Sequence, residues 1–463
     1  MGMSVKKSKE KSAKGWSASG GKKSASKSVK SKGEKIAKTY SVLRGMRDIL
    51  PKEERYWKKL YHSIEDLGQY FQYGRIETPL LEEASLFVRS VGKGTDVVDK
   101  EMYLFEDKDG TKVCLRPENT ASVVRAYIGN GLWNQSQPVK LWYYGPMFRH
   151  DRPQAGRYRQ FWQVGFESLG SSDPSVDAEL ILIAYDLYKD LGLSVTVRLN
   201  SLGIPEERER YRNELVSYYR SKRSYICGDC KNRLNRNPLR LLDCKAEECR
   251  ETKDNAPQII DYLGSESKNH LMKVLEYLDA VEIPYQLDHA LVRGLDYYTH
   301  TVFEFYVTDI EGGAQSALGG GGRYDLLAEQ LGGKPTPACG FSLGLDRIVS
   351  AWRENLTKTN SEVPREKLDI YLAQLGEEGR RVSLRLLNDL RASGIKVGFN
   401  FSKSSLKAQM ELADSAKVQF VLIIGQKEVQ DKTVIIRDME SGIQEVADVK
   451  KVEGLVKRKL GRA

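Results

Sequence analysis

The chain has 463 residues, of which 40% are hydrophobic and 29% are charged. This composition is typical of a globular protein with a sizeable core, and the length indicates two to four domains. No apolar run approaches the roughly 18 residues of a membrane-spanning helix, and six cysteines are too few for a disulfide-built protein, so we expect a cytoplasmic protein without membrane contacts.

The net charge of +10 resides in residues 1–38. This segment has twelve lysines and two glutamates, a surplus of ten, so the rest of the chain is electrically balanced. Because its Lys/Ser/Gly/Ala composition cannot bury enough apolar surface to offset ordering, we expect a disordered tail. A phosphate-attracting arm and a solubilising or targeting extension are equally compatible with this composition.

A helix is predicted from Pro51, because apolar residues recur at three- and four-residue steps up to Phe71. Residues 75–79 follow as a strand. Further on, Glu118 is expected just after a strand, at the start of a helix. Its carboxylate could hold an ammonium group or simply cap the helix together with Thr120.

Residues 139–170 alternate like two paired strands joined by a loop at 151–156. Because side chains alternate along a strand, Gln163 and Glu167 are expected on one face, and Trp162 on the opposite, core face. Arg149 ends the first strand, and three more arginines follow in the loop. Arginine forks suit phosphate recognition, although a charged tip on an edge hairpin has the same appearance.

A helix at 176–191 and a strand at 195–200 precede a charged, Arg-rich helical insertion at about 205–275. The insertion contains four cysteines in a C-x2-C and C-x4-C arrangement, separated by 13 residues: Cys227, Cys230, Cys244 and Cys249. This spacing is close to that of a structural four-thiolate zinc site. The spacing by itself leaves zinc occupancy open.

Three segments after the insertion combine cations, aromatic rings and glycines. Arg293 precedes Tyr297 and Tyr298 at the entrance of a strand, which suits an anion and a polar ring but also an ordinary strand core. Glycines 319–322 permit close backbone approach to a flat substrate or form a flexible turn. Arg347 lies in the first turn of a helix, where it could bind a triphosphate or pair with a surface carboxylate.

The last part of the chain alternates between apolar runs and helical segments. After a polar linker at 354–366, apolar runs at 370–372, 395–397, 420–424 and 434–436 alternate with three helical segments. This alternation predicts a small α/β domain on a largely parallel sheet.

Taken together, these segments resemble the bacterial-type histidyl-tRNA synthetases, which are class II aminoacyl-tRNA synthetases. GPMFRHDRPQAGRYRQFWQ resembles motif 2, GFSLGLDRI resembles motif 3, and the first helix with 75–79 resembles the dimer-forming motif 1. RGLDYYTHTVFE and ALGGGGRYD resemble the two segments peculiar to the histidine enzymes. The resemblance covers about residues 40–460.

The resemblance implies an α+β fold. It consists of an antiparallel-sheet class II catalytic domain at 39–353 with the helical insertion, and an α/β anticodon-binding domain at 367–463. It also implies a homodimer that uses ATP and Mg²⁺ to activate L-histidine and then transfers histidine to the 3' end of tRNA(His). The alternative is a non-catalytic, synthetase-like regulatory subunit of histidine biosynthesis, opposed by the intact motif arginines and the C-terminal domain.

Residue roles follow from the resemblance, position by position. Arg149 and Arg293 are implied as catalytic groups on the α-phosphate of ATP, and Arg347 is implied at its γ-phosphate. Arg152 and Gln154 are implied at the acceptor end of tRNA. The histidine-binding residues implied by the resemblance are Glu118, Thr120, Gln163, Glu167, Tyr297, Tyr298 and Tyr324.

Overall fold

The computed structural model describes residues 40–462, apart from 93–94, 155, 309–316 and 364–366. The tail predicted at 1–38 lies outside the described residues. Among the described residues, no helix combines the length and the apolar character needed to cross a bilayer.

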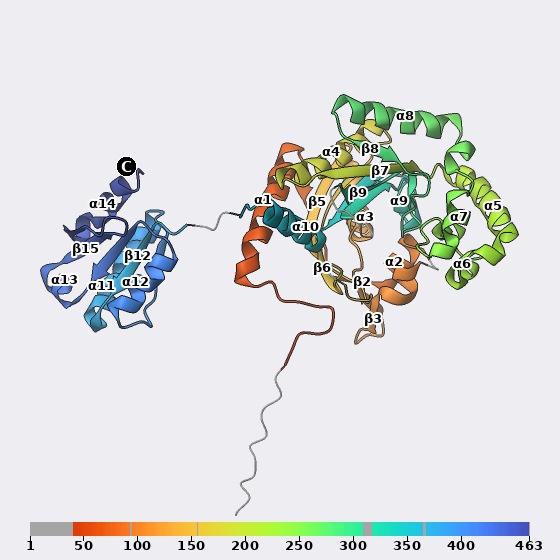
Figure 1. Cartoon of the computed structure of the whole chain (residues 1–463). Coiled ribbons are helices and arrows are strands. Elements are labelled where there is room, and N and C mark those ends of the chain that lie inside the picture. The colour runs from red at the N-terminus through yellow and green to blue at the C-terminus, as the bar shows by residue number, and fades with distance from the viewer. Residues whose placement is uncertain (1–39, 93–94, 155, 309–316, 364–366, 463) are drawn as a thin grey trace, which may run out of the picture. The chain divides into compact units, whose positions relative to one another are not determined.

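An eight-stranded sheet forms the centre of the first folded part (Figure 1). Its order is β1-β5-β6-β11-β10-β9-β7-β8. The strands are β1 (Gly74–Arg75), β5 (Val139–Phe148), β6 (Gln160–Leu169), β7 (Val195–Ser201), β8 (Tyr285–Leu287), β9 (Thr299–Val307), β10 (Gly319–Arg323) and β11 (Ala338–Gly344). Neighbours are antiparallel except the outermost pairs, β1–β5 and β7–β8. The predicted antiparallel sheet is confirmed.

The strand predicted at 75–79 is wrong beyond Arg75, where β1 ends. The cause is a competing set of hydrogen bonds. The buried Arg116 guanidinium donates to the carbonyl oxygen of Thr78 at 3.0 Å, and the Thr78 hydroxyl donates to Asn119 at 2.7 Å. These bonds turn the backbone away from the sheet and toward the start of the next helix.

Three helices bury one face of the sheet: α1 (Pro51–Tyr70), α4 (Pro174–Asp190) and α10 (Leu345–Lys358). They share a hydrophobic core with Val164 and Phe166 of β6. Helices α1 and α10 lie side by side (Figure 1), with the rings of Tyr56 and Trp352 5.6 Å apart. Trp162 packs against the same core, as its position in the alternation predicts. The opposite face of β6 is therefore free to carry polar groups.

A second, three-stranded sheet and two helices lie next in the chain. The sheet has the order β2-β4-β3 and consists of β2 (Leu81–Glu83), β3 (Tyr103–Glu106) and β4 (Lys112–Leu115). The helices are α2 (Ala84–Ser90) and α3 (Thr120–Gly129), and the short α9 (Leu327–Gln330) contacts both. This unit delivers the segment between β4 and α3, including Glu118, to the polar side of the large sheet.

The predicted insertion is helical, and its last helix extends five residues beyond the expected boundary. It contains α5 (Pro205–Ser221), α6 (Gly228–Arg233), α7 (Arg250–Asp254) and α8 (Ser265–Ala280). Tyr211, Leu215 and Tyr219 on α5 pack into a core that also contains the strand residue Val302. The insertion and the polar side of the sheet therefore share one hydrophobic cluster.

The C-terminal part has a five-stranded sheet of order β13-β12-β14-β15-β16. Its strands are β12 (Ile370–Gln374), β13 (Val397–Phe399), β14 (Phe420–Ile424), β15 (Thr433–Asp438) and β16 (Gln444–Asp448). Its helices are α11 (Gly376–Ala392), α12 (Leu406–Ser415), α13 (Gln426–Asp431) and α14 (Val452–Lys459). The sheet is mixed, because β14–β15 and β15–β16 are antiparallel.

The prediction of a largely parallel sheet is therefore wrong in this half of the domain. Strand β16 has mostly exposed residues and no run of apolar side chains, so its sequence gives no strand pattern. Gly442 adopts a positive φ of 71° and permits the tight turn that returns β16 against β15. The prediction of an α/β domain itself is confirmed.

Candidate active site

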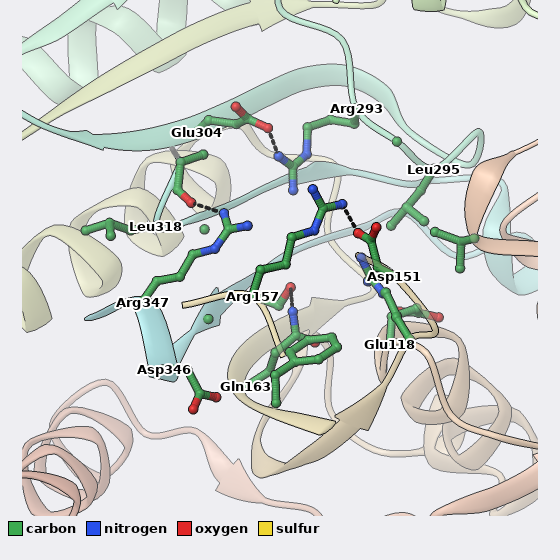
Figure 2. Close-up of a pocket in the computed structure, with 18 of the residues that line it drawn as sticks. Glu118, Asp151, Arg157, Gln163, Arg293, Leu295, Glu304, Leu318, Asp346 and Arg347 are labelled. Atoms are coloured by element: carbon green, nitrogen blue, oxygen red, sulfur yellow. Dashed lines mark hydrogen bonds and ion pairs between the residues drawn. The ribbon is translucent and has the colours of Figure 1, made fainter. Parts of the chain in front are cut away.

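A cavity of about 270 Å³ opens on the polar side of the large sheet (Figure 2). Four arginines reach its lining from separate parts of the chain: Arg149, Arg157, Arg293 and Arg347. Three of these were predicted from the sequence. The fold brings them together because β5, β6, β9 and β11 lie close to one another in a single sheet.

Arg149 follows the end of β5 and is fixed on both its backbone and its side chain. Its backbone N–H donates to the carbonyl of Arg159 at 2.9 Å, which closes the loop of the hairpin. Its Nε donates to the carbonyl of Pro117 at 2.8 Å. Arg149 is therefore held beside the segment that carries Glu118.

Arg293 is held by an ion pair with Glu304 of β9 (Figure 2). Glu304 also accepts a hydrogen bond from the Tyr306 hydroxyl. Burial alone would lower the pKa of Arg293, but the carboxylate of Glu304 and the hydroxyl groups of Tyr298 and Tyr297 together outweigh burial and raise it. The guanidinium is therefore permanently charged and fixed. Glu304 is the last residue of the segment RGLDYYTHTVFE, but its spacing from Arg293 does not identify it as the partner that positions this arginine.

Arg347 lies in the first turn of α10, as predicted, and donates to the carbonyl of Ala317 at 2.6 Å. Burial lowers its pKa, and the nearby cations Arg157 and Arg149 lower it further. Three guanidinium groups that disfavour one another around one cavity create a strong preference for a multiply charged anion. Arg157 pairs with Asp151 and lines the cavity. It is one of the loop arginines that the sequence marked for phosphate recognition, although no role was assigned to it.

Glu118 caps a helix, as its sequence position suggested, and also lines the cavity. Its carboxylate accepts hydrogen bonds from the backbone N–H groups of Thr120 at 2.7 Å and Ala121 at 3.0 Å, so it caps α3. It also lines the cavity, and burial raises its pKa. Gln163 lines the cavity too, and its buried Oε1 has no hydrogen-bond partner among the described residues. These oxygens suit an ammonium group.

A buried polar cluster lies next to the open cavity. Glu167 is fully buried and accepts hydrogen bonds from the Tyr324 hydroxyl at 2.5 Å and the Thr120 hydroxyl at 2.8 Å. Burial raises the pKa of Glu167 to about 8. Tyr297 and Tyr298 line the cavity itself, and the ring of Tyr297 lies 5.7 Å from that of Tyr324. The tyrosines therefore connect the cavity to this cluster.

Not every predicted residue faces the open cavity. Thr120, Glu167 and Tyr324 contact one another but do not line it. Arg152 and Gln154 are exposed on the hairpin loop, outside the lining. Side chains that contact a large partner must be exposed, and these two are.

The four glycines do not form a flexible turn. Gly319 to Gly322 lie in β10, hydrogen-bonded between β9 and β11. A Cβ atom on Gly321 would lie 2.1 Å from the carbonyl oxygen of Gly340. Gly319 lines the cavity, so close backbone approach to a ligand is available at this one position.

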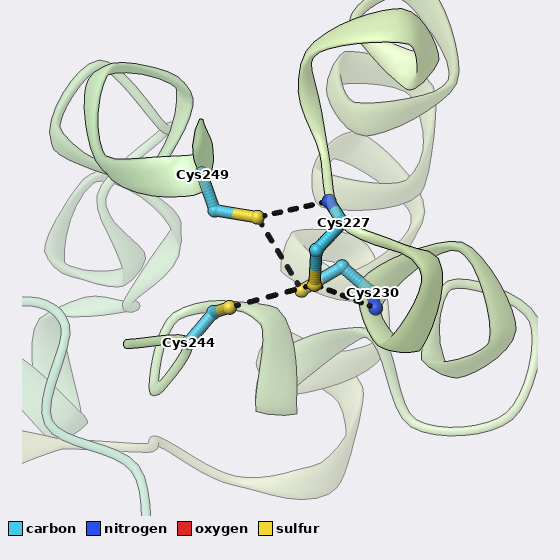
Figure 3. A group of neighbouring side chains, drawn as sticks. All are labelled: Cys227, Cys230, Cys244 and Cys249. Carbon is cyan, nitrogen blue, oxygen red and sulfur yellow. Dashed lines mark hydrogen bonds between the residues drawn. The ribbon is translucent and has the colours of Figure 1, made fainter. Parts of the chain in front are cut away.

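The four cysteines of the insertion meet, although they come from three short segments (Figure 3). All four sulfur atoms lie within 4.8 Å of one another. Sγ of Cys227 lies 3.8 Å from that of Cys244, and Sγ of Cys249 lies 3.9 Å from that of Cys230. A tetrahedral zinc site with Zn–S bonds of about 2.3 Å separates its sulfurs by about 3.8 Å, so the donor set fits zinc.

Comparison with known proteins gives matches over nearly the whole described chain. A family model described as histidyl-tRNA synthetase matches residues 45–348, and one described as an anticodon binding domain matches residues 369–459. The histidine–tRNA ligase of Desulforamulus reducens is 45% identical over 416 residues, which cover 89% of this chain and 98% of that protein. The histidine–tRNA ligase of Natranaerobius thermophilus is 44% identical over 420 residues, which cover 90% of this chain and 99% of that protein.

Solved structures match as well. The apo histidyl-tRNA synthetase of S. aureus has a TM-score of 0.74 and 35% identity, covering 90% of this chain and 100% of that one. A second match is a Bacillus halodurans protein described as an ATP phosphoribosyltransferase regulatory subunit/histidyl-tRNA synthetase. Its TM-score is 0.60 at 24% identity, and the match covers 84% of this chain and 99% of that one. The second match shows a shared fold only.

Proposed function

The chain belongs to the histidyl-tRNA synthetase family and is a histidine–tRNA ligase, and from this premise we propose how its residues divide the reaction. The regulatory-subunit alternative is not favoured, because curated relatives at 42–46% identity over most of the chain are ligases. The enzyme condenses histidine with ATP and then transfers the histidyl group to tRNA.

We propose that Arg149 and Arg293 hold the α-phosphate from two sides while the histidine carboxylate attacks phosphorus in line. A P–O bond to histidine forms as the bond to pyrophosphate breaks, so charge stabilisation and alignment matter more than proton transfer. Arg347 then holds the γ-phosphate end of the leaving pyrophosphate. The observation that carries this proposal is the convergence of these guanidinium groups on one cavity.

ATP enters as its Mg²⁺ complex in this proposal. Oxygen ligands of the kind that Mg²⁺ prefers line the same cavity at Asp151 and Glu304. The metal supplies neutralisation of the phosphate charge. The arginines keep the role of orienting the α-phosphate, because both Arg149 and Arg293 are anchored by contacts within the protein.

For the amino acid, we propose that Glu118 and Gln163 receive the α-ammonium group, while Glu167 and Tyr298 bind the two imidazole nitrogens. Tyr297 and Tyr324 complete this end of the pocket. Thr120 acts through Glu167, to which its hydroxyl is bonded, as well as being near the ammonium position. A site built from buried hydrogen-bonding groups rejects ring isosteres that leave those groups unpaired.

We further propose contacts with tRNA at two places. Arg152 and Gln154 on the exposed hairpin loop approach the acceptor end, since they lie outside the cavity but between Asp151 and Gly156, which line it. The anticodon-binding domain, which matches its family model over residues 369–459, takes the other end of tRNA(His). The substrate makes the cytoplasm the expected location.

A homodimer is the proposed assembly. Apolar side chains are exposed on α1, which resembles part of motif 1, and on the three-stranded sheet: Tyr70 is 79% exposed, Leu104 57% and Leu81 48%. A second copy of the chain would cover them. Sedimentation velocity at micromolar concentration should give a species of about twice the chain mass, and a single monomeric species would contradict the assembly.

We also propose that Cys227, Cys230, Cys244 and Cys249 hold a structural zinc ion. Two backbone N–H groups already point at sulfur: Cys227 donates to Cys249 Sγ at 3.1 Å, and Cys230 donates to Cys227 Sγ at 3.4 Å. Such bonds stabilise thiolates. The cluster is not part of the cavity lining, so zinc takes no part in the chemistry.

The residue assignments are tested by ATP–pyrophosphate exchange with each of the twenty amino acids. Exchange is expected with histidine alone, and Arg293→Ala should lower its rate by about 10³-fold. Because this change also leaves Glu304 without its partner, Arg293→Ala combined with Glu304→Gln serves as the control for misfolding. A near-normal rate in Arg293→Ala would remove Arg293 from the reaction.

A further inference from the structure

The two cysteine pairs bracket a short segment of the insertion. Residues 231–243 run from Cys230 to Cys244 through the end of α6 and a 3₁₀ turn at Pro238–Leu241. Both ends of the segment are thus tied to the four-sulfur cluster (Figure 3). A metal at the cluster would fix the two ends relative to each other.

This bracketed segment contacts the loop that carries the histidine-pocket residues. Asn237 Nδ2 donates to Oδ1 of Asp296 at 3.2 Å. The guanidinium of Arg240 lies directly against Gly294, 3.1 Å from the position that a Cβ would occupy there. Arg240 and Arg233 also approach Asp96, at 3.6 Å and 3.7 Å. Asp96 immediately precedes Val97, which lines the cavity.

The loop at 293–298 has little support of its own. It forms neither helix nor strand, yet Arg293, Tyr297 and Tyr298 all line the cavity. The ion pair with Glu304 of β9 holds Arg293 at the start of the loop. For the rest of the loop, the Asp296 N–H donates to the carbonyl of Val91 at 3.1 Å, and Arg208 donates to the carbonyl of Tyr298 at 2.5 Å. The position of residues 294–298 therefore depends on neighbours outside the large sheet.

Apolar packing joins the same parts. One hydrophobic cluster contains Cys230, Cys244 and Cys249, the bracketed leucines, and the pocket tyrosines Tyr297 and Tyr298. The bracketed leucines in it are Leu234, Leu241 and Leu242. A shift of the bracketed segment would be transmitted to the tyrosines, because packed interiors move as discrete units.

We infer that the metal-bound cysteine cluster acts as a clamp that positions the histidine-binding loop 293–298 through residues 231–243, with Asn237 as a positioning residue. This inference rests on the proposed zinc site and adds a consequence for the binding of histidine. Loss of the metal should weaken histidine binding much more than ATP binding, because the loop carries the tyrosines of the amino-acid end, whereas Arg293 at its start is held separately by Glu304 of β9.

The first experiment measures zinc content and substrate affinity in the same full-length preparations. Wild type should contain one zinc per chain by elemental mass spectrometry. Cys244→Ser should lose the metal and raise the histidine KM in pyrophosphate exchange at least tenfold, with the ATP KM within twofold of wild type. Cys114→Ala, a buried cysteine outside the cluster, is the matched control and should keep both the zinc and the histidine KM.

A second experiment leaves the metal ligands intact. Asn237→Ala should keep its zinc and raise the histidine KM at least threefold without changing the ATP KM. The double variant Asn237→Asp with Asp296→Asn exchanges the two side chains and again has one donor and one acceptor. This exchanged pair should therefore recover the wild-type histidine KM. Asn235→Ala, at an exposed position on the same segment, should have no effect.

The outcomes separate the proposals. Absence of metal from wild type would overturn both the zinc site and the clamp. Zinc in wild type with an unchanged histidine KM in both Cys244→Ser and Asn237→Ala would overturn the clamp and leave the zinc site standing. If Cys244→Ser fails to fold, Asn237→Ala and its exchanged pair decide the matter. Failure of wild type to exchange with histidine would instead contradict the proposed division of the reaction.

Discussion

The pKa values of individual side chains in the pocket and next to it are shifted in opposite directions by their surroundings. Burial among other cations lowers the pKa of Arg347, while burial away from cations raises the pKa of Glu167 to about 8. The surroundings of Arg347 favour the binding of an anion, and the buried carboxyl group of Glu167 favours the binding of a hydrogen-bond donor. The cavity and the buried polar cluster next to it therefore have distinct chemical preferences before any ligand binds.

The raised pKa of Glu167 predicts a pH-dependent stability. The unfolded chain loses this proton near pH 4.5, whereas the folded protein retains it up to about pH 8. Stability should therefore fall as pH rises through this window, by about 2 kcal/mol between pH 6 and 8. Glu167→Gln should remove this part of the decrease, as measured by urea unfolding at both pH values.

The matched control for this measurement is Glu106→Gln, at an exposed position, which should leave the pH dependence as in wild type. An identical decrease in Glu167→Gln and wild type would show that Glu167 is ionised in the free enzyme.

Part of the site could be predicted at this scale. Strand alternation alone placed Gln163 and Glu167 on the face opposite Trp162, because a strand has a period of two whatever its neighbours are. The hydrogen bonds from Thr120 and Tyr324 to Glu167 could not be predicted from spacing, since these residues are 47 and 157 positions away in the chain.

At the scale of elements, strand β10 depends on its lack of side chains. Gly321→Ala would place a Cβ 2.1 Å from a backbone oxygen of the neighbouring strand, which cannot move aside cheaply. We expect a loss of about 1–3 kcal/mol in the free energy of unfolding. Urea unfolding checks this, with Gly129→Ala as the control, because a Cβ there meets nothing within 4 Å. Equal stabilities of the two variants would contradict the packing argument.

The hairpin between β5 and β6 predicts a separation of the two half-reactions. Arg152 and Gln154 are exposed on its loop, whereas Arg149 at its base is anchored beside Glu118. The double change Arg152→Ala with Gln154→Ala should lower kcat/KM for tRNA charging at least tenfold. Pyrophosphate exchange should stay within twofold of wild type. An equal loss in both assays would place these residues in the adenylation step instead.

At the scale of the whole molecule, charge is unevenly distributed along the chain. Residues 1–38 account for the net charge of +10, and the remainder is balanced. Deletion of 1–38 should leave the KM values for histidine and ATP within twofold of wild type, since the cavity is lined by residues from 97 onward. Pyrophosphate exchange measures both values, and a large rise in the histidine KM would contradict the assignment of the pocket.

The amino-acid sequence by itself determined the parts that depend on local periodicity and residue chemistry. Helix α1 and the hairpin of β5 and β6 are of this kind, because their patterns repeat over a few residues. The choice of Arg149, Arg293 and Arg347 as candidates followed from residue chemistry, since guanidinium groups suit anions. The motif segments likewise indicated the family, which the comparisons confirm.

Only the tertiary structure decided which distant groups meet. The order β6-β11-β10-β9 brings Gln163, Arg293 and Arg347 around one cavity, and it places four glycines in a central strand, where their sequence had left close approach to a substrate and a flexible turn as alternatives. It also gathers four cysteines from the insertion and pairs β16 with β15. Contacts of this kind follow from strand order and packing, which are set by burial across the whole chain. They produce no local repeat in the sequence, so they could not be predicted from it.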